Sequence, residues 1–173
     1  MIIDLDNFKH MNDTMGHLFG DALLAEVAHT IQKQFRSEDI VGRVGGDEFL
    51  VFLGQIPDVS LAEQKAAQIM KAIGEMAVQE LTDVELSCSI GIAVFPDCGQ
   101  SYNELFKRAD QALYRAKNRG KNGYCIADAK LFSDEFPQKP CSAANTRIDS
   151  DEETEGNVEL RLFEYVFRIL YKS

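Results

Sequence analysis

Three stretches of the chain carry apolar residues at helical spacing. The first predicts a helix from about Ala22 to Phe35, with Asp21 placed to cap the exposed N–H groups of its first turn. Its apolar positions are Leu24, Val27, Ala28, Ile31 and Phe35. The other two stretches predict helices from Leu61 to Val78 and from about Tyr102 to Asn118.

Short β-type runs lie between these helices. Ile40–Val44 and Glu48–Leu53 flank Gly45-Gly46-Asp47, and this glycine-rich separation predicts a hairpin because glycine accepts positive φ. Glu85–Phe95, followed by Pro96, predicts another strand. The chain opens on Met1-Ile2-Ile3, inside an apolar strand, so we expect the front of the natural domain to be missing.

The character of the sequence changes after Ile126. Two prolines and the acidic run Asp149–Glu155 predict a solvated linker. The predicted division is a folded domain at 1–129, a linker at 130–157 and an apolar C-terminal segment at 158–173. The last segment has three open interpretations: a short helix docked on the domain, a linker to another domain, or a fragment boundary.

Composition narrows the class of function. With 173 residues and 45% hydrophobic content, the chain suits one domain with a substantial core. A formal charge of -10 argues against a general grip on nucleic acid or anionic lipid, so an anionic substrate needs a metal or a local cluster of bases. No apolar run approaches the roughly 20 residues that span a bilayer. The four cysteines lack the spacing of a zinc site or disulfide framework, which fits a reducing cytoplasm.

Two pairs of carboxylates lie where they suit a metal ion. Asp4 and Asp6 are two positions apart on the first predicted strand and so point to the same side, while Asp47 and Glu48 lie at the hairpin tip. Mg²⁺ takes one or two protein carboxylates together with substrate phosphates. Pairing the first strand beside the hairpin brings Asp4 and Asp47 together. Taken singly, Asp47 is more simply a turn residue and Asp4 a strand-end charge.

Four blocks of sequence follow one another along the chain. They are Asp4–Asp21 (D-x-D-x-F-K-x-x-N-D-x-x-G-H-x-x-G-D), Arg43–Phe49 (R-V-G-G-D-E-F), Ser89–Ala93 (S-I-G-I-A) and Ala109–Lys117 (A-D-x-A-L-Y-x-A-K). Together they resemble the signatures of the GGDEF family of diguanylate cyclases, over about residues 1 to 126. We expect the family's usual leader helix, with a D-x-L-T-G-L-x-N-R-like motif, to be missing from this sequence. The resemblance implies an α/β (α+β) fold with a mixed, largely antiparallel central sheet flanked by helices, similar to the palm of nucleotide cyclases and polymerases.

The resemblance also assigns roles to the carboxylates. It implies that Asp4 and Asp47 are side-chain ligands of Mg²⁺ (or Mn²⁺), with the Leu5 carbonyl as a third oxygen, which leaves Asp6 a structural role. It further implies that Asp47 acts as base toward a 3'-hydroxyl, with Glu48 alongside.

Substrate-binding positions follow from the same resemblance. They are Asn12 and Asp21 for guanine, Gly45 and Gly46 for close approach of phosphates, and Lys117 and Lys121 for phosphate contact, with Lys9 as a further catalytic cation. The guanine-site residues can also be a turn residue and a helix cap, and the lysines can be solvated cations, two of them at a helix C-terminus. We interpret His17 as a structural hydrogen-bonding residue.

Arg36-Ser37-Glu38-Asp39 matches the family's R-x-x-D inhibitory site, where cyclic di-GMP feeds back on the enzyme. Arginine can hold phosphate bidentately and stack on guanine, and aspartate can accept from the guanine edge. The alternative is a solvated helix end.

The resemblance therefore implies a cytoplasmic diguanylate cyclase. Two protomers each present one Mg²⁺-bound GTP, and each 3'-hydroxyl attacks the other's α-phosphate and releases pyrophosphate. A homodimer is needed because one protomer cannot complete that reaction. Two alternatives stay open: a catalytically impaired GGDEF module that senses GTP or cyclic di-GMP, and an adenylate or guanylate cyclase of the same palm ancestry.

Overall fold

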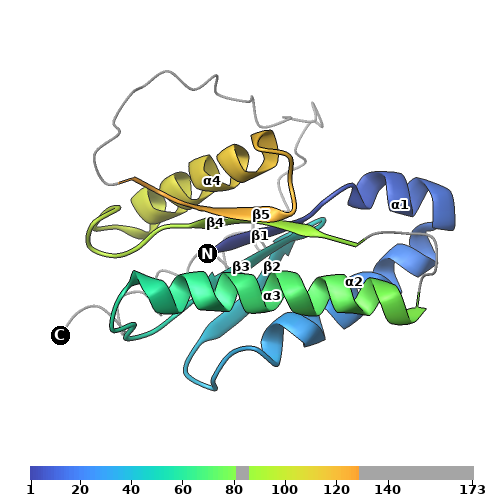
Figure 1. The fold of residues 1–173 in the computed structure, drawn as a ribbon, viewed down its shortest axis with the longest axis horizontal. Coiled ribbons are helices and arrows are strands. Elements are labelled where there is room, and N and C mark those ends of the chain that lie inside the picture. The colour runs from blue at the N-terminus through green and yellow to red at the C-terminus, as the bar shows by residue number, and fades with distance from the viewer. Residues whose placement is uncertain (81–85, 129–173) are drawn as a thin grey trace, which may run out of the picture. The chain divides into compact units, whose positions relative to one another are not determined.

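Five strands form one sheet in the order β2-β3-β1-β4-β5 (Figure 1). The computed structural model describes residues 1–80 and 86–128. Its elements are β1 (Ile2–Leu5), α1 (Phe8–Met15), α2 (His17–Gln32), β2 (Ile40–Gly45), β3 (Glu48–Phe52), α3 (Val59–Glu80), β4 (Cys88–Ile92), α4 (Tyr102–Asn118) and β5 (Gly123–Ile126). Neighbouring strands are antiparallel except β4 and β5, which are parallel. The predicted fold class is therefore confirmed.

The main core lies between the sheet and the helices α2 and α3. Side chains alternate along a strand, so Ile3 and Leu5 of β1 point to the same face as Phe49 and Val51 of β3. They pack with fully or nearly fully buried residues of the two helices, namely Leu23, Leu24, Val27 and Ile31 of α2 and Ala62, Ala66, Ile69 and Ile73 of α3. The apolar spacing that predicts helices in the sequence is therefore the spacing of the residues that face this core.

Helix α4 covers the opposite face of the sheet (Figure 1). Its backbone lies so close to β4 that a Cβ at Gly91 would be 2.0 Å from the Ala109 carbonyl oxygen, so only glycine fits there. At its start, Ser101 and Glu104 form a capping box. At its end, Lys121 N donates to Ala116 O and Gly120 N to Lys117 O, both at 3.3 Å, which is a Schellman motif around Gly120 at φ 112°.

Near the N-terminus one predicted helix has the wrong bounds, and a second helix was not predicted. The predicted helix from Ala22 to Phe35 begins at His17 and ends at Gln32, so Asp21 lies within α2 and does not cap it. Helix α1 was not predicted, since eight residues with only Phe8 and Met11 buried give no repeating pattern. Neither helix has a side-chain cap that the sequence could reveal: the N-cap residue of α1 is Asn7 with φ 59°, and that of α2 is Gly16 with φ 90°.

The strand predictions are closer to the structure. The hairpin forms β2 and β3, and the strand expected at 85–95 is shorter, at Cys88–Ile92. The edge strand β5 was not predicted. Its four residues pair in parallel with β4, which lies more than 30 positions earlier in the sequence. The strand therefore depends on the tertiary fold and not on a local turn.

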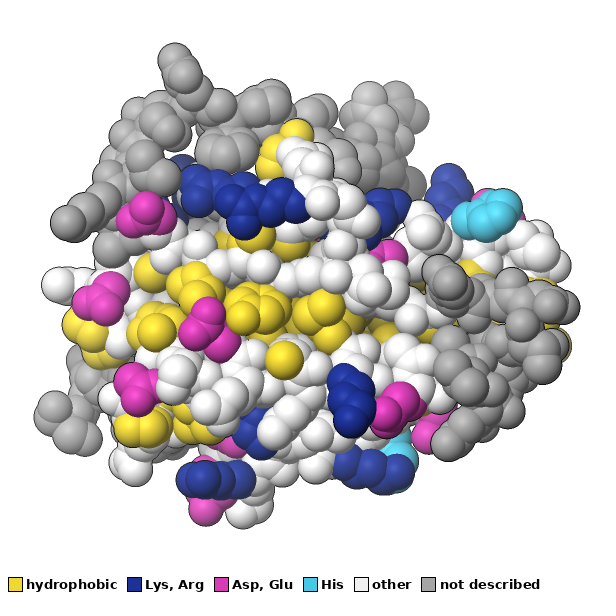
Figure 2. All heavy atoms as spheres, viewed as in Figure 1, with side chains coloured by type: hydrophobic (Ala, Val, Ile, Leu, Met, Phe, Trp, Pro, Cys, Tyr) yellow, Lys and Arg dark blue, Asp and Glu magenta, His cyan; other side chains and the backbone are white. Residues whose placement is uncertain are grey.

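Residues Met1–Ala127 form one compact unit. The linker and the C-terminal segment expected at 130–157 and 158–173 lie outside the described residues, so that division stays a prediction. Among the described helices, none combines the length and the apolar character needed to cross a membrane. Figure 2 shows a face on which Lys and Arg side chains gather on the side of α4, with acidic side chains spread among apolar ones elsewhere.

Candidate active site

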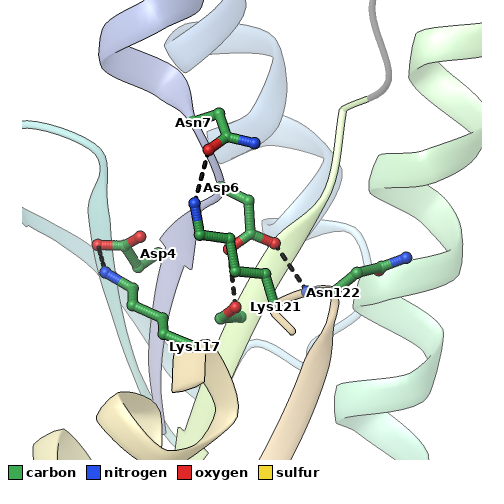
Figure 3. A network of polar contacts seen from close by, with 7 residues as sticks. Asp4, Asp6, Asn7, Lys117, Lys121 and Asn122 are labelled. Carbon is green, nitrogen blue, oxygen red and sulfur yellow. Dashed lines mark hydrogen bonds and ion pairs between the residues drawn. The ribbon is translucent and has the colours of Figure 1, made fainter. Parts of the chain in front are cut away.

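The C-terminal end of β1 brings the first predicted carboxylate to a lysine of α4. Asp4 pairs in register with Glu48 of β3 on one side and with Ser89 of β4 on the other. Its carboxylate is 2.7 Å from the Lys117 ammonium, and the residue is only 6% exposed (Figure 3). A carboxylate in the middle strand thus has a cation from the last turn of α4 as its partner.

The hairpin tip lies against the same end of β1. Leu5 N donates to Asp47 O at 3.3 Å, which ties the strand to the turn. The β2–β3 register shifts between Arg43 and Gly45, and Arg43 Nε donates to Gly46 O at 2.8 Å across the turn. Gly46 has φ 55°, and a Cβ on it would meet nothing within 4 Å, so the tip is open on that side.

Several negative charges face one another here. Burial raises the pKa of Asp4, while the hydrogen bond and charge of Lys117 act against this and the charge of Asp47 adds to it. Burial likewise raises the pKa of Glu48, reinforced by the charges of Asp4, Asp110 and Asp47 and opposed by Lys117. Asp110 of α4 is an acidic neighbour that sequence reasoning missed, because it lies in a helix far along the chain.

This arrangement fits a divalent cation. The negative charges of neighbouring carboxylates raise one another's pKa, and a bound cation would reduce this repulsion. Lys117 already supplies one positive charge, through its ion pair with Asp4. Two carboxylates and a backbone carbonyl are a suitable set of protein ligands for Mg²⁺, and phosphates and water would complete its coordination shell. Within residues 1–80 and 86–128, no group of three or more His, Cys, Asp or Glu side chains is arranged to hold a metal.

The predicted guanine-site residues lie around the start of α2. Asn12 Nδ2 is 2.9 Å from His17 Nδ1, so His17 makes the hydrogen bond expected of a structural residue. Asn12 Oδ1 is buried and has no partner among the described residues. A Cβ at Gly20 would be 2.3 Å from that oxygen, so glycine lets Asn12 pack there. Asp21 lies in the second turn of α2, directly after Gly20, and is exposed.

The predicted phosphate-contacting lysines both reach the end of β1, by different routes. Helix α4 ends at Asn118, so Lys121 lies in the turn beyond it. Its Nζ donates to Asn7 Oδ1 at 2.6 Å (Figure 3). Lys9, the third predicted cation, is exposed on α1.

Asp6 makes hydrogen bonds that the sequence pattern did not reveal. It is 3% exposed, and its carboxylate accepts from Ser89 Oγ at 2.7 Å, Ser87 Oγ at 2.8 Å and Asn122 N at 2.9 Å. These donors come from β4, the residue before it, and the loop before β5, so no local signal could have found them.

The R-x-x-D residues lie in the turn between α2 and β2. Arg36 is exposed, and its backbone N donates to Asp39 Oδ2 at 3.1 Å. Gly54 N donates to Asp39 Oδ1 at 3.2 Å. Asp39 therefore organises the backbone of the turn in addition to any role toward a ligand, and the site is not a solvated helix end.

Comparison with known proteins decides the family. A family model described as "Diguanylate cyclase, GGDEF domain" matches residues 1–123. The chain belongs to the GGDEF domain family. The resemblance stated from its sequence blocks is confirmed.

This GGDEF domain has curated relatives of more than one named activity. It is 40% identical over 131 residues to the bifunctional diguanylate cyclase/cyclic di-GMP phosphodiesterase MucR of Pseudomonas aeruginosa, covering 76% of this chain and 19% of that protein. It is 39% identical over 124 residues to the cyclic di-GMP phosphodiesterase PdeR of Escherichia coli, covering 72% of this chain and 19% of that one. The chain thus spans about a fifth of the length of these curated relatives.

Solved GGDEF structures share the fold. The GGDEF domain of YfiN (TpbB) from Pseudomonas aeruginosa is similar with a TM-score of 0.69 and 34% identity, covering 73% of this chain and 80% of that one. The active GGEEF domain of a diguanylate cyclase from Vibrio cholerae has a TM-score of 0.66 and 34% identity, with the same coverage of 73% and 80%. The fold of this domain is therefore the fold of solved GGDEF domains.

Proposed function

We propose that this GGDEF domain condenses two GTP into cyclic di-GMP and two pyrophosphates, as a Mg²⁺-dependent homodimer. The observation that carries the proposal is the meeting of three separate segments at the end of β1. Asp4 of the strand, Asp47 of the hairpin and Lys117 of α4 converge there, with Asp4 and Lys117 2.7 Å apart. Phosphoryl transfer needs this combination of metal-binding carboxylates and cations at one place.

Asp4, Asp47 and the Leu5 carbonyl would hold the divalent ion. When bound, the ion supplies positive charge that neutralises the phosphates and polarises them as a Lewis acid. Lys117 is then the cation that shifts its contact from Asp4 toward phosphate oxygens. Its side chain is about one-third exposed, at 34%, so it has access to a ligand from its present position.

The proton of the attacking hydroxyl needs an acceptor. Asp47 is proposed as that base, with Glu48 alongside. The raised pKa of Glu48 makes its carboxylate a better proton acceptor than an ordinary glutamate. Each 3'-oxygen forms a bond to an α-phosphorus, the bond to the β-phosphate oxygen breaks, pyrophosphate leaves, and the proton passes to the carboxylate.

Asn12 and Asp21 are proposed to bind guanine. Their chemistry suits that base, because an amide both donates and accepts, and the exposed Asp21 carboxylate can accept from guanine N–H groups. Lys121 and Lys9 are proposed as further contacts to the triphosphate, and Gly45 and Gly46 as the open backbone along which it lies.

Feedback by cyclic di-GMP is proposed at Arg36 and Asp39. The exposed Arg36 is available to the product's phosphate and guanine. Asp39 accepts one backbone N–H on each oxygen, and each carboxylate oxygen has a second acceptor site for the guanine edge.

The test is product analysis. The chain is incubated with GTP and Mg²⁺ over a range of protein concentrations, and the nucleotides are separated and identified by mass. We expect cyclic di-GMP from the natural sequence and a loss of at least about a hundredfold in Asp47→Ala, the size expected for removing a general base. Product formation that survives in Asp47→Ala contradicts the site assignment, and a monomeric cyclic nucleotide contradicts the reaction.

A sensor domain is the second candidate. The similarity to a protein named as a cyclic di-GMP phosphodiesterase favours it, because a segment similar to this domain occurs in a protein named for a different activity. A sensor binds GTP or cyclic di-GMP and releases no pyrophosphate. Retained GTP binding with no cyclic di-GMP, even at high protein concentration, would select this alternative.

A further inference from the structure

Asp6 is a buried carboxylate with an unusual set of partners. All three of its donors lie more than 80 positions away in sequence, from Ser87 to Asn122. The two serines approach from β4 and the residue before it, and the third donor is the backbone N–H of Asn122 (Figure 3). A backbone donor cannot become an acceptor or turn away, so this contact fixes the path of the chain as well as a side chain.

The turn that Asp6 holds has a strained backbone. Lys121 and Asn122 are consecutive non-glycine residues with φ 64° and φ 43°. L-residues with side chains rarely adopt this region, and such residues persist when surrounding contacts hold them there. On one side the turn is fixed by the helix cap, where Lys121 N donates to Ala116 O. On the other side it is fixed by Asp6.

The same turn determines where the Lys121 ammonium lies. Its Nζ is 2.6 Å from Asn7 Oδ1. Asn7 directly follows Asp6 and lies two residues after Leu5, a predicted metal ligand. Asn7 itself has φ 59°. Asp6 is thus connected to both partners of this contact. It is bonded covalently to Asn7, and it accepts a hydrogen bond from Asn122, the residue after Lys121.

A direct role for Asp6 in binding a metal fits this geometry poorly. Three of its roughly four acceptor sites are occupied. It is also 3% exposed, so coordination would require breaking hydrogen bonds to a buried charge.

We propose that Asp6 is a positioning residue: by holding the Lys121–Asn122 turn against β1, it places the Lys121 ammonium where the triphosphate of a guanine nucleotide binds. This rests on the proposed function, since the triphosphate is its ligand. Asp6 acts through Lys121 and does not touch the nucleotide.

The first test measures the turn without nucleotide. Amide hydrogen exchange at Asn122 is compared in the natural chain, Asp6→Ala, Asp6→Asn and Ser89→Ala. Asp6→Ala removes the acceptor, so exchange at Asn122 accelerates. Asp6→Asn keeps one oxygen for that N–H while its amide donates to a rotated Ser89 hydroxyl, so protection is retained. Ser89→Ala is the matched control, since it removes a donor to the other carboxylate oxygen. Unchanged exchange in Asp6→Ala, or equal acceleration in Ser89→Ala, overturns the proposal.

The second test is a double-mutant cycle with 3'-deoxy-GTP and Mg²⁺, a pair that binds without forming product. Asp6→Ala and Lys121→Ala are each expected to weaken binding about tenfold, the effect of losing one charged phosphate contact. If Asp6 acts through Lys121, the double variant binds no more weakly than Lys121→Ala alone. Asp6→Asn should bind within about threefold of the natural chain. Additive losses, or an Asp6→Asn loss equal to that of Asp6→Ala, overturn the proposal.

The two tests separate the inference from the function on which it rests. A natural chain that fails to bind 3'-deoxy-GTP contradicts the proposed function, while the exchange at Asn122 still decides whether Asp6 holds the turn. Binding by the natural chain with an additive cycle leaves the proposed function in place and removes the role of Asp6 in it.

Discussion

Burial disfavours the ionised form of two neighbouring carboxyl groups, Asp4 on β1 and Glu48 on β3. Burial and neighbouring negative charges raise the pKa of Glu48 and of Asp4. A carboxyl with a raised folded-state pKa binds protons more tightly when folded than when unfolded. Stability therefore falls as pH rises from the ordinary glutamate value toward the raised one, and the ionised group opposes folding above it.

Glu48→Gln should therefore stabilise the domain at neutral pH. The substitution removes the opposing charge, so the melting temperature should be higher than that of the natural chain at pH 7.5. The difference should vanish at about pH 3, well below the ordinary pKa of glutamate, where Glu48 is protonated in both folded and unfolded chains. Thermal unfolding across this pH range measures it. Glu26→Gln, at an exposed position of α2, is the control, and an equal gain in both variants would contradict the explanation.

The sequence indicates which residue types suit a metal or a phosphate, but not which of these residues touch one another. The predicted ligand Asp4 and the predicted cation Lys117 lie together, because the last turn of α4 reaches the C-terminal end of β1. The partners of Asp6 and the proximity of Asp110 to Glu48 were missed. These contacts join residues far apart in sequence, and neither spacing nor periodicity carries information about them.

Helices and strands with strong local signals were predicted well. Helix α4 has the predicted bounds, Tyr102–Asn118, because it has a capping box at its start and a glycine just past its end. Helix α2 was predicted five residues too late because Gly16 precedes it with no side-chain cap. Asp21 matches the pattern of an N-cap only because it is an acidic residue directly before the part of α2 whose apolar residues repeat at helical spacing.

Ser101→Ala should weaken α4 and the domain that depends on it. The hydroxyl accepts from Glu104 N at 3.3 Å, and loss of an N-cap of this type lowers the free energy of unfolding by about 1 kcal/mol. Chemical denaturation measures the change. Ser101→Asn replaces one preferred cap by another and should stay close to the natural chain. Equal losses in both variants would show that the cap is not the cause.

At the scale of the whole molecule, the proposed reaction requires two protomers. Below the dissociation constant of the dimer, the specific activity should rise in proportion to protein concentration, because each active unit forms from two chains. The test measures initial rates of cyclic di-GMP formation over a roughly hundredfold range of protein concentration, and sedimentation gives the oligomeric state over the same range. A constant specific activity in a protein that sediments as a monomer would contradict the dimer mechanism.

The central claim is that the end of β1 holds a divalent cation together with a guanine nucleotide. The most direct measurement is the affinity for Mn²⁺ in the presence of 3'-deoxy-GTP, followed by the loss of the free-ion electron paramagnetic resonance signal. Asp4→Asn keeps the shape of the buried side chain and removes its charge, so it should weaken Mn²⁺ binding at least about tenfold. Asp97→Asn, at an exposed position between β4 and α4, should bind like the natural chain. Equal Mn²⁺ affinity in Asp4→Asn and the natural chain would contradict the claim.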